Sequence, residues 1–176
     1  SEKRIPIADK ANIDVLLGAT TPLTVHHQLY HSTKVLTDML GGGFSAHLMQ
    51  TIRERDGLTY GVSATLAGLD AGADGYFKIW ATFSPQRYEE SIAKLRKEVD
   101  IFFRDGLTEA ALIRRQEEIA GSYLVALSTT RSLAATLHSI GALGFDFSYL
   151  TEYPNIIRAV SLDDIKNAAD LIPKNK

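Results

Sequence analysis

The sequence predicts an α+β domain in which helices pack on one face of an antiparallel or mixed sheet. Segments with strand patterning occur only before residue 84, and the rest of the chain has helical patterning. Strands first and helices afterwards, without regular alternation, are typical of this class rather than of a parallel α/β sheet. With 176 residues and 45% hydrophobic composition, residues 1–176 have the size of a single domain with one core.

Three segments have strand patterns. In residues 12–18, apolar and polar side chains alternate up to Gly18, where we expect the strand to end. Residues 58–66 alternate most clearly, and the alternation places Tyr60 on the apolar face with Leu58 and Val62. Residues 76–83 follow a short loop rich in glycine and aspartate, which predicts an antiparallel hairpin with residues 58–66.

Helices are predicted by apolar stripes between capping residues. The first, residues 29–40, ends at a glycine triplet, and the second has Ser45 as its N-cap and Gly57 just beyond its C-terminal end. No element is assigned to residues 145–160. The later helices are expected to follow the caps Ser84, Thr108 and Ser161, with one more starting near Thr130.

Composition and charge exclude several functions. The 19 basic and 21 acidic residues are scattered, so a nucleic-acid partner is not expected. The chain has no cysteine, which removes disulfides, thiolate metal sites and a cysteine nucleophile. No apolar run reaches the ~18 residues of a membrane span, and no signal-peptide pattern opens the sequence. These features do not decide the cellular compartment of the protein, and we expect a bacterial periplasm or cytoplasm.

Histidine clusters and hydrolase motifs are the first candidates for chemistry. His27 and His31 are four residues apart and His26 is adjacent, but the residues between do not complete H-E-x-x-H, and H-x-x-E-H does not occur. Solvent-exposed histidines at the start of a helix are therefore favoured over a metal site. No G-x-S-x-G motif is present, so a self-contained serine hydrolase is not predicted.

The glycine triplet Gly41, Gly42 and Gly43 is the second candidate. A phosphate could bind at the N-terminus of the helix that follows, but the lysine and the preceding strand of a P-loop are missing. A hinge between two helices is the simpler interpretation, because glycine permits backbone angles that are closed to other residues.

Arg53 and Tyr60 are the third candidate. Arg53 is near the end of its helix and Tyr60 is early in the next strand, so the turn at Asp56 and Gly57 can fold both side chains toward a common space. Residue chemistry alone favours an arginine that interacts with the helix dipole and a tyrosine packed in the core.

The stretch "LGGGFSAHLMQTIRERDGLTYGVSA" resembles the start of the C-terminal domain of the pitrilysin family of zinc peptidases, which includes insulin-degrading enzyme and the mitochondrial processing peptidases. The glycine-rich turn and the arginine followed seven positions later by a tyrosine both match, and the likeness continues more loosely from about residue 12 to the last helix. His47 replaces the usual arginine of this stretch, so the family's local ion pair is not expected there. Asp56 stands where a basic residue is common.

The resemblance implies a composite peptidase site. Family members hold zinc through H-x-x-E-H in a separate N-terminal half, so no metal ligand is expected in this chain and no activity from it alone. By resemblance, Arg53 and Tyr60 are the catalytic and substrate-binding residues that reach across the cleft to an extended peptide, while Gly41, Gly42 and Gly43 act as a hinge. The expected partners are the peptide and the zinc-bearing half, in the same polypeptide or in a second subunit.

Two further expectations depend on the same resemblance. The alternative function is a catalytically inactive binding or structural subunit of the same fold, and an H-x-x-E-H motif upstream would argue against it. The chain is also expected to be a domain excised from a longer protein and lacking its last strand, since the family usually continues with a closing strand. An open sheet edge of that kind should favour association.

Overall fold

A three-stranded antiparallel sheet forms the base of the computed structural model, which describes residues 11–69 and 75–172. Strand β3 (Gly75–Phe83) is central and pairs with β1 (Ile13–Thr21) on one side and β2 (Thr59–Ala67) on the other. The predicted hairpin is confirmed. The first strand is longer than expected, because its pairing with β3 continues through Gly18, opposite Lys78, and on to Thr21.

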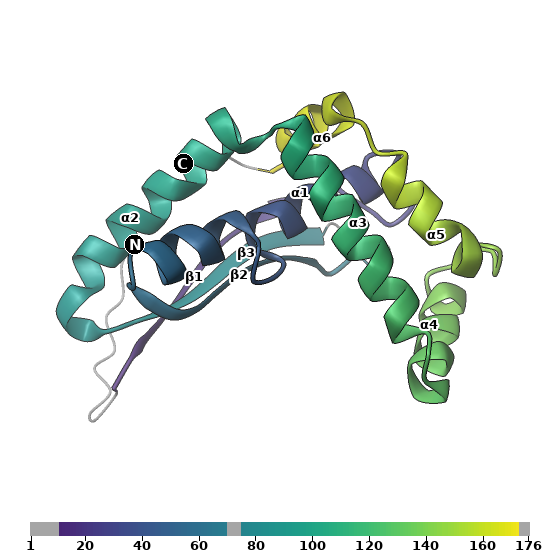
Figure 1. Cartoon of the computed structure of the whole chain (residues 1–176), viewed down its shortest axis with the longest axis horizontal. Coiled ribbons are helices and arrows are strands. Elements are labelled where there is room, and N and C mark those ends of the chain that lie inside the picture. Colours follow the sequence, from purple (N-terminus) through teal and green to yellow (C-terminus); the bar gives the residue numbers. More distant parts are fainter. Residues whose placement is uncertain (1–10, 70–74, 173–176) are drawn as a thin grey trace.

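One face of the sheet is buried and the other is open. Figure 1 shows α1 and α2 on the same side of the strands, and the side chains that alternate toward this side form the core. On the opposite face, Leu16 is 66% exposed, because its neighbours Val15 and Leu17 point inward and side chains alternate along a strand. The predicted α+β class, with helices on one face of an antiparallel sheet, is confirmed. The buried hydrophobic residues of the sheet are Val15, Val62, Ala64, Phe77, Ile79, Ala81 and Phe83.

The helices follow the predicted order with one addition. The hydroxyl groups of Ser84, Thr108 and Ser161 accept backbone N–H groups as expected, and Ser161 forms a capping box with Asp164. None of the helices in the described ranges has the length and apolar character that crossing a membrane requires. The elements are α1 (Tyr30–Gly41), η1 (Met49–Arg55), η2 (Pro85–Arg87), α2 (Tyr88–Ile101), η3 (Phe102–Gly106), α3 (Glu109–Ala126), α4 (Thr130–Ala142), α5 (Tyr149–Arg158) and α6 (Leu162–Ala169).

Helix α5 is the addition, and it contains Pro154. Proline has no backbone N–H, so it leaves the carbonyl of Leu150 without its partner inside the helix. The hydroxyl of Tyr123, from α3, donates to that carbonyl at 3.0 Å. At the end of α5, the buried Gln116 amide donates to the carbonyls of Ile157, Arg158 and Val160. Helix α3 therefore supplies the hydrogen bonds that α5 cannot make for itself.

Candidate functional site

The helix that carries Arg53 is a π-helix. Segment η1 has wider turns than an α-helix, and the N–H of Asp56 bonds to the carbonyl of Thr51, five residues back, at 3.0 Å. Short π-segments are common at functional sites. Gly57 follows with φ of 58° and therefore occupies the left-handed position expected after the helix.

Ser45 does not cap this helix, contrary to the sequence prediction. The residue at the cap position is Leu48, and no side chain bonds to the first N–H groups. The hydroxyl of Ser45 instead donates to Glu118 at 2.7 Å and accepts from Arg115 at 2.9 Å. Both partners lie on α3, so Ser45 ties the glycine-rich loop to a distant helix.

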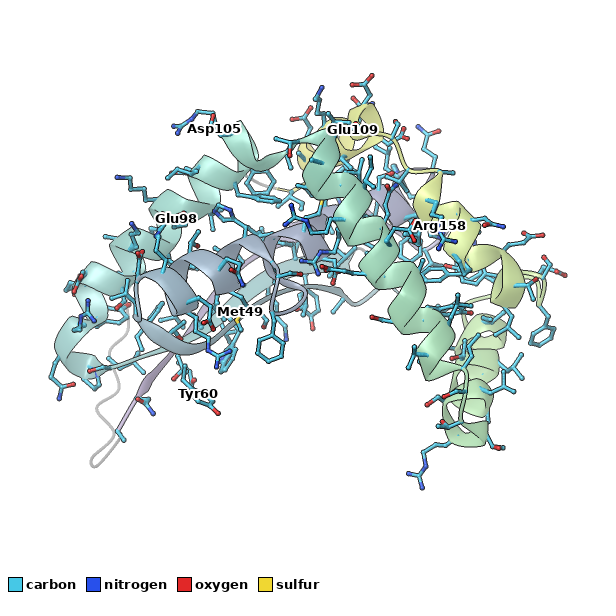
Figure 2. All side chains as sticks on the ribbon, in the orientation of Figure 1. Met49, Tyr60, Glu98, Asp105, Glu109 and Arg158 are labelled. Atoms are coloured by element: carbon cyan, nitrogen blue, oxygen red, sulfur yellow. The ribbon has the colours of Figure 1, made fainter. Side chains whose placement is uncertain are left out.

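A β-bulge turns Tyr60 out of the sheet. Thr59 lies opposite Phe83 and Val62 lies opposite Ala81, so Tyr60 and Gly61 together face a single residue of β3. An extra residue of this kind re-aims the side chains next to it. Thr59 and Val62 both face the core, whereas Tyr60 is 86% exposed. The expectation that Tyr60 packs in the core is therefore wrong, and Figure 2 shows its side chain projecting away from the helices.

The structure brings Arg53 and Tyr60 together. The guanidinium carbon of Arg53 lies 5.6 Å from the centre of the Tyr60 ring and 5.5 Å from the centre of the Phe44 ring. Contacts of this length between a cation and an aromatic ring are attractive. Phe44 is 74% exposed, and no sequence pattern singled it out, although an apolar ring between glycine and serine in a loop is a signal that could have done so.

Two glycines of the triplet, Gly41 and Gly42, are needed for space rather than for unusual backbone angles. An ideal Cβ on Gly41 would lie 2.3 Å from the Ala64 nitrogen of β2, and one on Gly42 would lie 2.6 Å from the Asp38 Cα. Gly42 has φ of −85°, and the positive-φ glycines among the described residues are Gly57, Gly68 and Gly144. The prediction that the triplet is needed for its backbone angles is therefore wrong. Gly41 lets the end of α1 approach β2 closely, and Gly42 leaves room for Asp38.

A buried carboxylate stabilises the other side of η1. Glu98 of α2 is 2% exposed and accepts from Arg55 at 2.8 Å, with Lys94 at 3.4 Å and His47 at 3.2 Å. Burial opposes ionisation, but the hydrogen bond from Arg55 and the nearby cations hold the pKa of Glu98 below its usual value. Burial lowers the pKa of His47 despite this neighbour. A carboxylate thus lies 3.2 Å from His47, but burial disfavours the charged histidine, in line with the expectation that the family's ion pair is not kept here.

The histidines near the start of α1 do not converge on a metal site. His27 accepts the N–H of Leu29 at 3.1 Å, and His31 bonds to the hydroxyl of Tyr149 at 2.9 Å. Both are half-buried, so the expectation of solvent exposure is right for His26 alone. Within residues 11–69 and 75–172, no group of three or more histidine, cysteine, aspartate or glutamate side chains is placed to hold a metal ion.

The surface formed by Phe44, Arg53 and Tyr60 can bind carbonyl groups. Arg53 has 29% of its side chain exposed, and Glu54 lies 3.6 Å from its Nε. A guanidinium offers five N–H donors in a plane, and a phenol offers one O–H. These donors suit the backbone carbonyls of an extended chain.

Comparison with known proteins identifies the family. Residues 1–119 match the family model described as the peptidase M16 inactive domain. The chain is 26% identical over 147 residues to the uncharacterized zinc protease YmxG of Bacillus subtilis, covering 84% of this chain and 36% of that protein. It is 27% identical over 167 residues to the non-peptidase homolog YmxG of Helicobacter pylori, covering 94% of this chain and 38% of the relative.

Solved structures share the fold. The peptidase M16 inactive domain from Pseudomonas fluorescens superposes with a TM-score of 0.80 at 22% identity, over 93% of this chain and 39% of the other. A protease from Helicobacter pylori gives a TM-score of 0.76 at 17% identity, over 93% of this chain and 39% of the other.

The fold and the family model together define an inactive-type peptidase domain. The chain belongs to the M16 family of zinc proteases and corresponds to the inactive C-terminal half of such proteins. The resemblance to zinc peptidases is therefore confirmed. The chain spans a little over a third of the length of the two relatives named above.

Proposed function

We propose that this chain is the substrate-binding half of a composite zinc peptidase and that Arg53 and Tyr60 are its contribution to the site. The observation that carries the proposal is the contact between these two side chains on an exposed surface, at the start of an edge strand. The bulge exposes the phenol, and the π-helix presents the guanidinium beside it. The zinc protease names of the relatives support the same reaction class.

The two side chains have different roles in this proposal. The planar fork of Arg53 donates to backbone carbonyls of an extended peptide and so holds the chain in register. The hydroxyl of Tyr60 donates to the carbonyl oxygen as it gains negative charge during attack. The other half would hold zinc, and the bound metal would activate the attacking water. This chain thus binds and orients the peptide and stabilises developing charge.

The alternative is a binding or structural subunit without catalysis. One relative that aligns with 94% of this chain is named a non-peptidase homolog, which favours this second function. Phe44, Arg53 and Tyr60 could hold a peptide whether or not a zinc-bearing half cleaves it.

The test is Arg53→Ala in the complex of this chain with its zinc-bearing half, as one polypeptide or two. Hydrogen bonds from a charged donor are worth about 1.5–3 kcal/mol, so peptide affinity should fall about 10- to 100-fold. Arg158→Ala is the matched control, because Arg158 is a half-exposed arginine paired with Glu117 on α3, far from Tyr60 in Figure 2.

The outcomes separate the two functions. Turnover by the wild-type complex, lost together with affinity in Arg53→Ala, supports the peptidase. If the wild-type complex binds peptide without turnover and Arg53→Ala loses that affinity, the result supports the binding subunit. Unchanged affinity in a folded Arg53→Ala variant contradicts both.

A further inference from the structure

The loop between α1 and η1 carries Phe44, whose ring contacts the Arg53 guanidinium. An exposed ring on a loop keeps one position only when the backbone on both sides is held. On the side of η1, the amide of Gln50 donates to the Phe44 carbonyl at 2.6 Å. The residues on either side of Phe44 need partners of their own to keep the ring in place.

Arg115 binds the residue that follows Phe44 and lies near the residue that precedes it. It comes from α3, is 7% exposed, and donates to the hydroxyl of Ser45 at 2.9 Å. On the other side of Phe44, an ideal Cβ on Gly43 would lie 3.5 Å from Nη1 of Arg115, so the guanidinium lies near that residue and leaves room for a methyl group. One buried side chain therefore bonds to the residue after Phe44 and lies near the residue before it.

Two carboxylates hold Arg115 in this place. Its Nη1 lies 3.0 Å from Glu118 and 3.5 Å from Asp38. Burial raises the pKa of Asp38, and the charge of Arg115 opposes that rise. Ser45 also donates to Glu118, so the loop, α1 and α3 meet at one buried cation. A guanidinium suits this place because its fork can serve several acceptors in one plane.

We propose that Arg115 is a positioning residue for Arg53, acting through Ser45 and Phe44. By fixing the loop, it keeps the Phe44 ring against the Arg53 guanidinium. The consequence for peptide binding rests on the proposed function, whereas the effect on the Arg53 side chain does not.

The test uses Ser45→Ala, which removes the hydrogen bonds from the loop to Arg115 and to Glu118 but leaves both carboxylate pairs of Arg115 in place. Removing Arg115 itself leaves two carboxylates facing each other and can unfold the protein, so the serine variant carries the experiment. The readout is the NMR signal of the Arg53 Nε–H group, which feels the ring currents of Phe44 and Tyr60. Ser122→Ala is the control, because Ser122 is an exposed serine on α3.

We expect Ser45→Ala and Phe44→Leu to shift the Arg53 signal in the same direction, while Ser122→Ala leaves it unchanged. In the complex with the zinc-bearing half, Ser45→Ala should raise KM about fivefold with kcat within about twofold, because one hydrogen bond is worth about 1 kcal/mol. An unshifted Arg53 signal in a folded Ser45→Ala variant overturns the positioning role. A shifted signal with unchanged KM supports positioning and contradicts the proposed role of Arg53 in peptide binding.

Discussion

Replacing Gly41 with alanine should destabilise the protein, although the residue ends a helix. Alanine is favoured over glycine within a helix by up to about 1 kcal/mol, so propensity alone predicts a gain. The added Cβ would lie 2.3 Å from the Ala64 nitrogen and 3.0 Å from the Ser63 carbonyl carbon, both backbone atoms of β2. Forcing extra volume into a packed contact costs about 1–3 kcal/mol, and a backbone neighbour cannot rotate away. The cost of the added volume less the gain in helix propensity gives an expected net loss of about 1 kcal/mol.

Urea unfolding, followed by far-UV circular dichroism, measures this loss as a lower midpoint at unchanged slope. Gly43→Ala is the control within the triplet, because its Cβ would meet Arg115 at an ordinary 3.5 Å, and its midpoint should stay close to that of the wild type. If the triplet served only as a flexible hinge, the two variants would behave alike. A Gly41→Ala protein as stable as the wild type, or more stable, would refute the close-packing argument.

Three other predictions concern stability. Burial lowers the pKa of His31 to about 4, so the unfolded chain binds a proton that the folded chain does not, and stability should fall as pH drops from about 6.5 to about 4. Urea midpoints measured over this pH range check the prediction, and the midpoint of His31→Asn should depend less on pH than that of the wild type. Tyr123→Phe should cost about 1 kcal/mol, and less in a Pro154→Ala background, where the restored N–H can serve the Leu150 carbonyl; equal costs in both backgrounds would contradict the link. Gln116→Leu should cost about 2 kcal/mol in the same assay, because the carbonyls at the end of α5 and just beyond it lose the hydrogen bonds from the buried amide.

Local signals predicted much of the fold. The strands at residues 58–66 and 76–83 and the caps at Ser84, Thr108 and Ser161 were predicted from neighbours in the sequence. The structure contains these strands and caps, although a bulge interrupts the alternation at Tyr60. The hairpin and the one-sided helical layer followed from these elements.

Features that depend on distant contacts were missed. The face of Tyr60 is set by a bulge, which exists only in the pairing with β3. Helix α5 contains a proline, and its compensation comes from Tyr123 on another helix. The role of Gly41 follows from its approach to β2, and Ser45 bonds to Arg115 on α3 instead of capping the helix.

The candidate site was found by resemblance rather than by physical reasoning. Residue chemistry favoured a core tyrosine and a surface arginine, whereas the motif placed Arg53 and Tyr60 together. The structure brings the two side chains into contact and adds Phe44, which neither line of reasoning selected.

Turnover of an extended peptide by a Tyr60→Phe variant tests the proposed function most directly. The measurement uses the complex with the zinc-bearing half, and the control is Tyr76→Phe, which removes another exposed hydroxyl from the same sheet. Loss of one donor to a developing oxyanion costs about 10²–10³ in kcat, so the kcat of the Tyr60→Phe complex should fall by that factor. The kcat of the Tyr76→Phe complex should equal that of the wild type, and both variants should keep the wild-type thermal stability. Near wild-type kcat in a folded Tyr60→Phe complex would contradict the assignment of Tyr60 to the peptidase site.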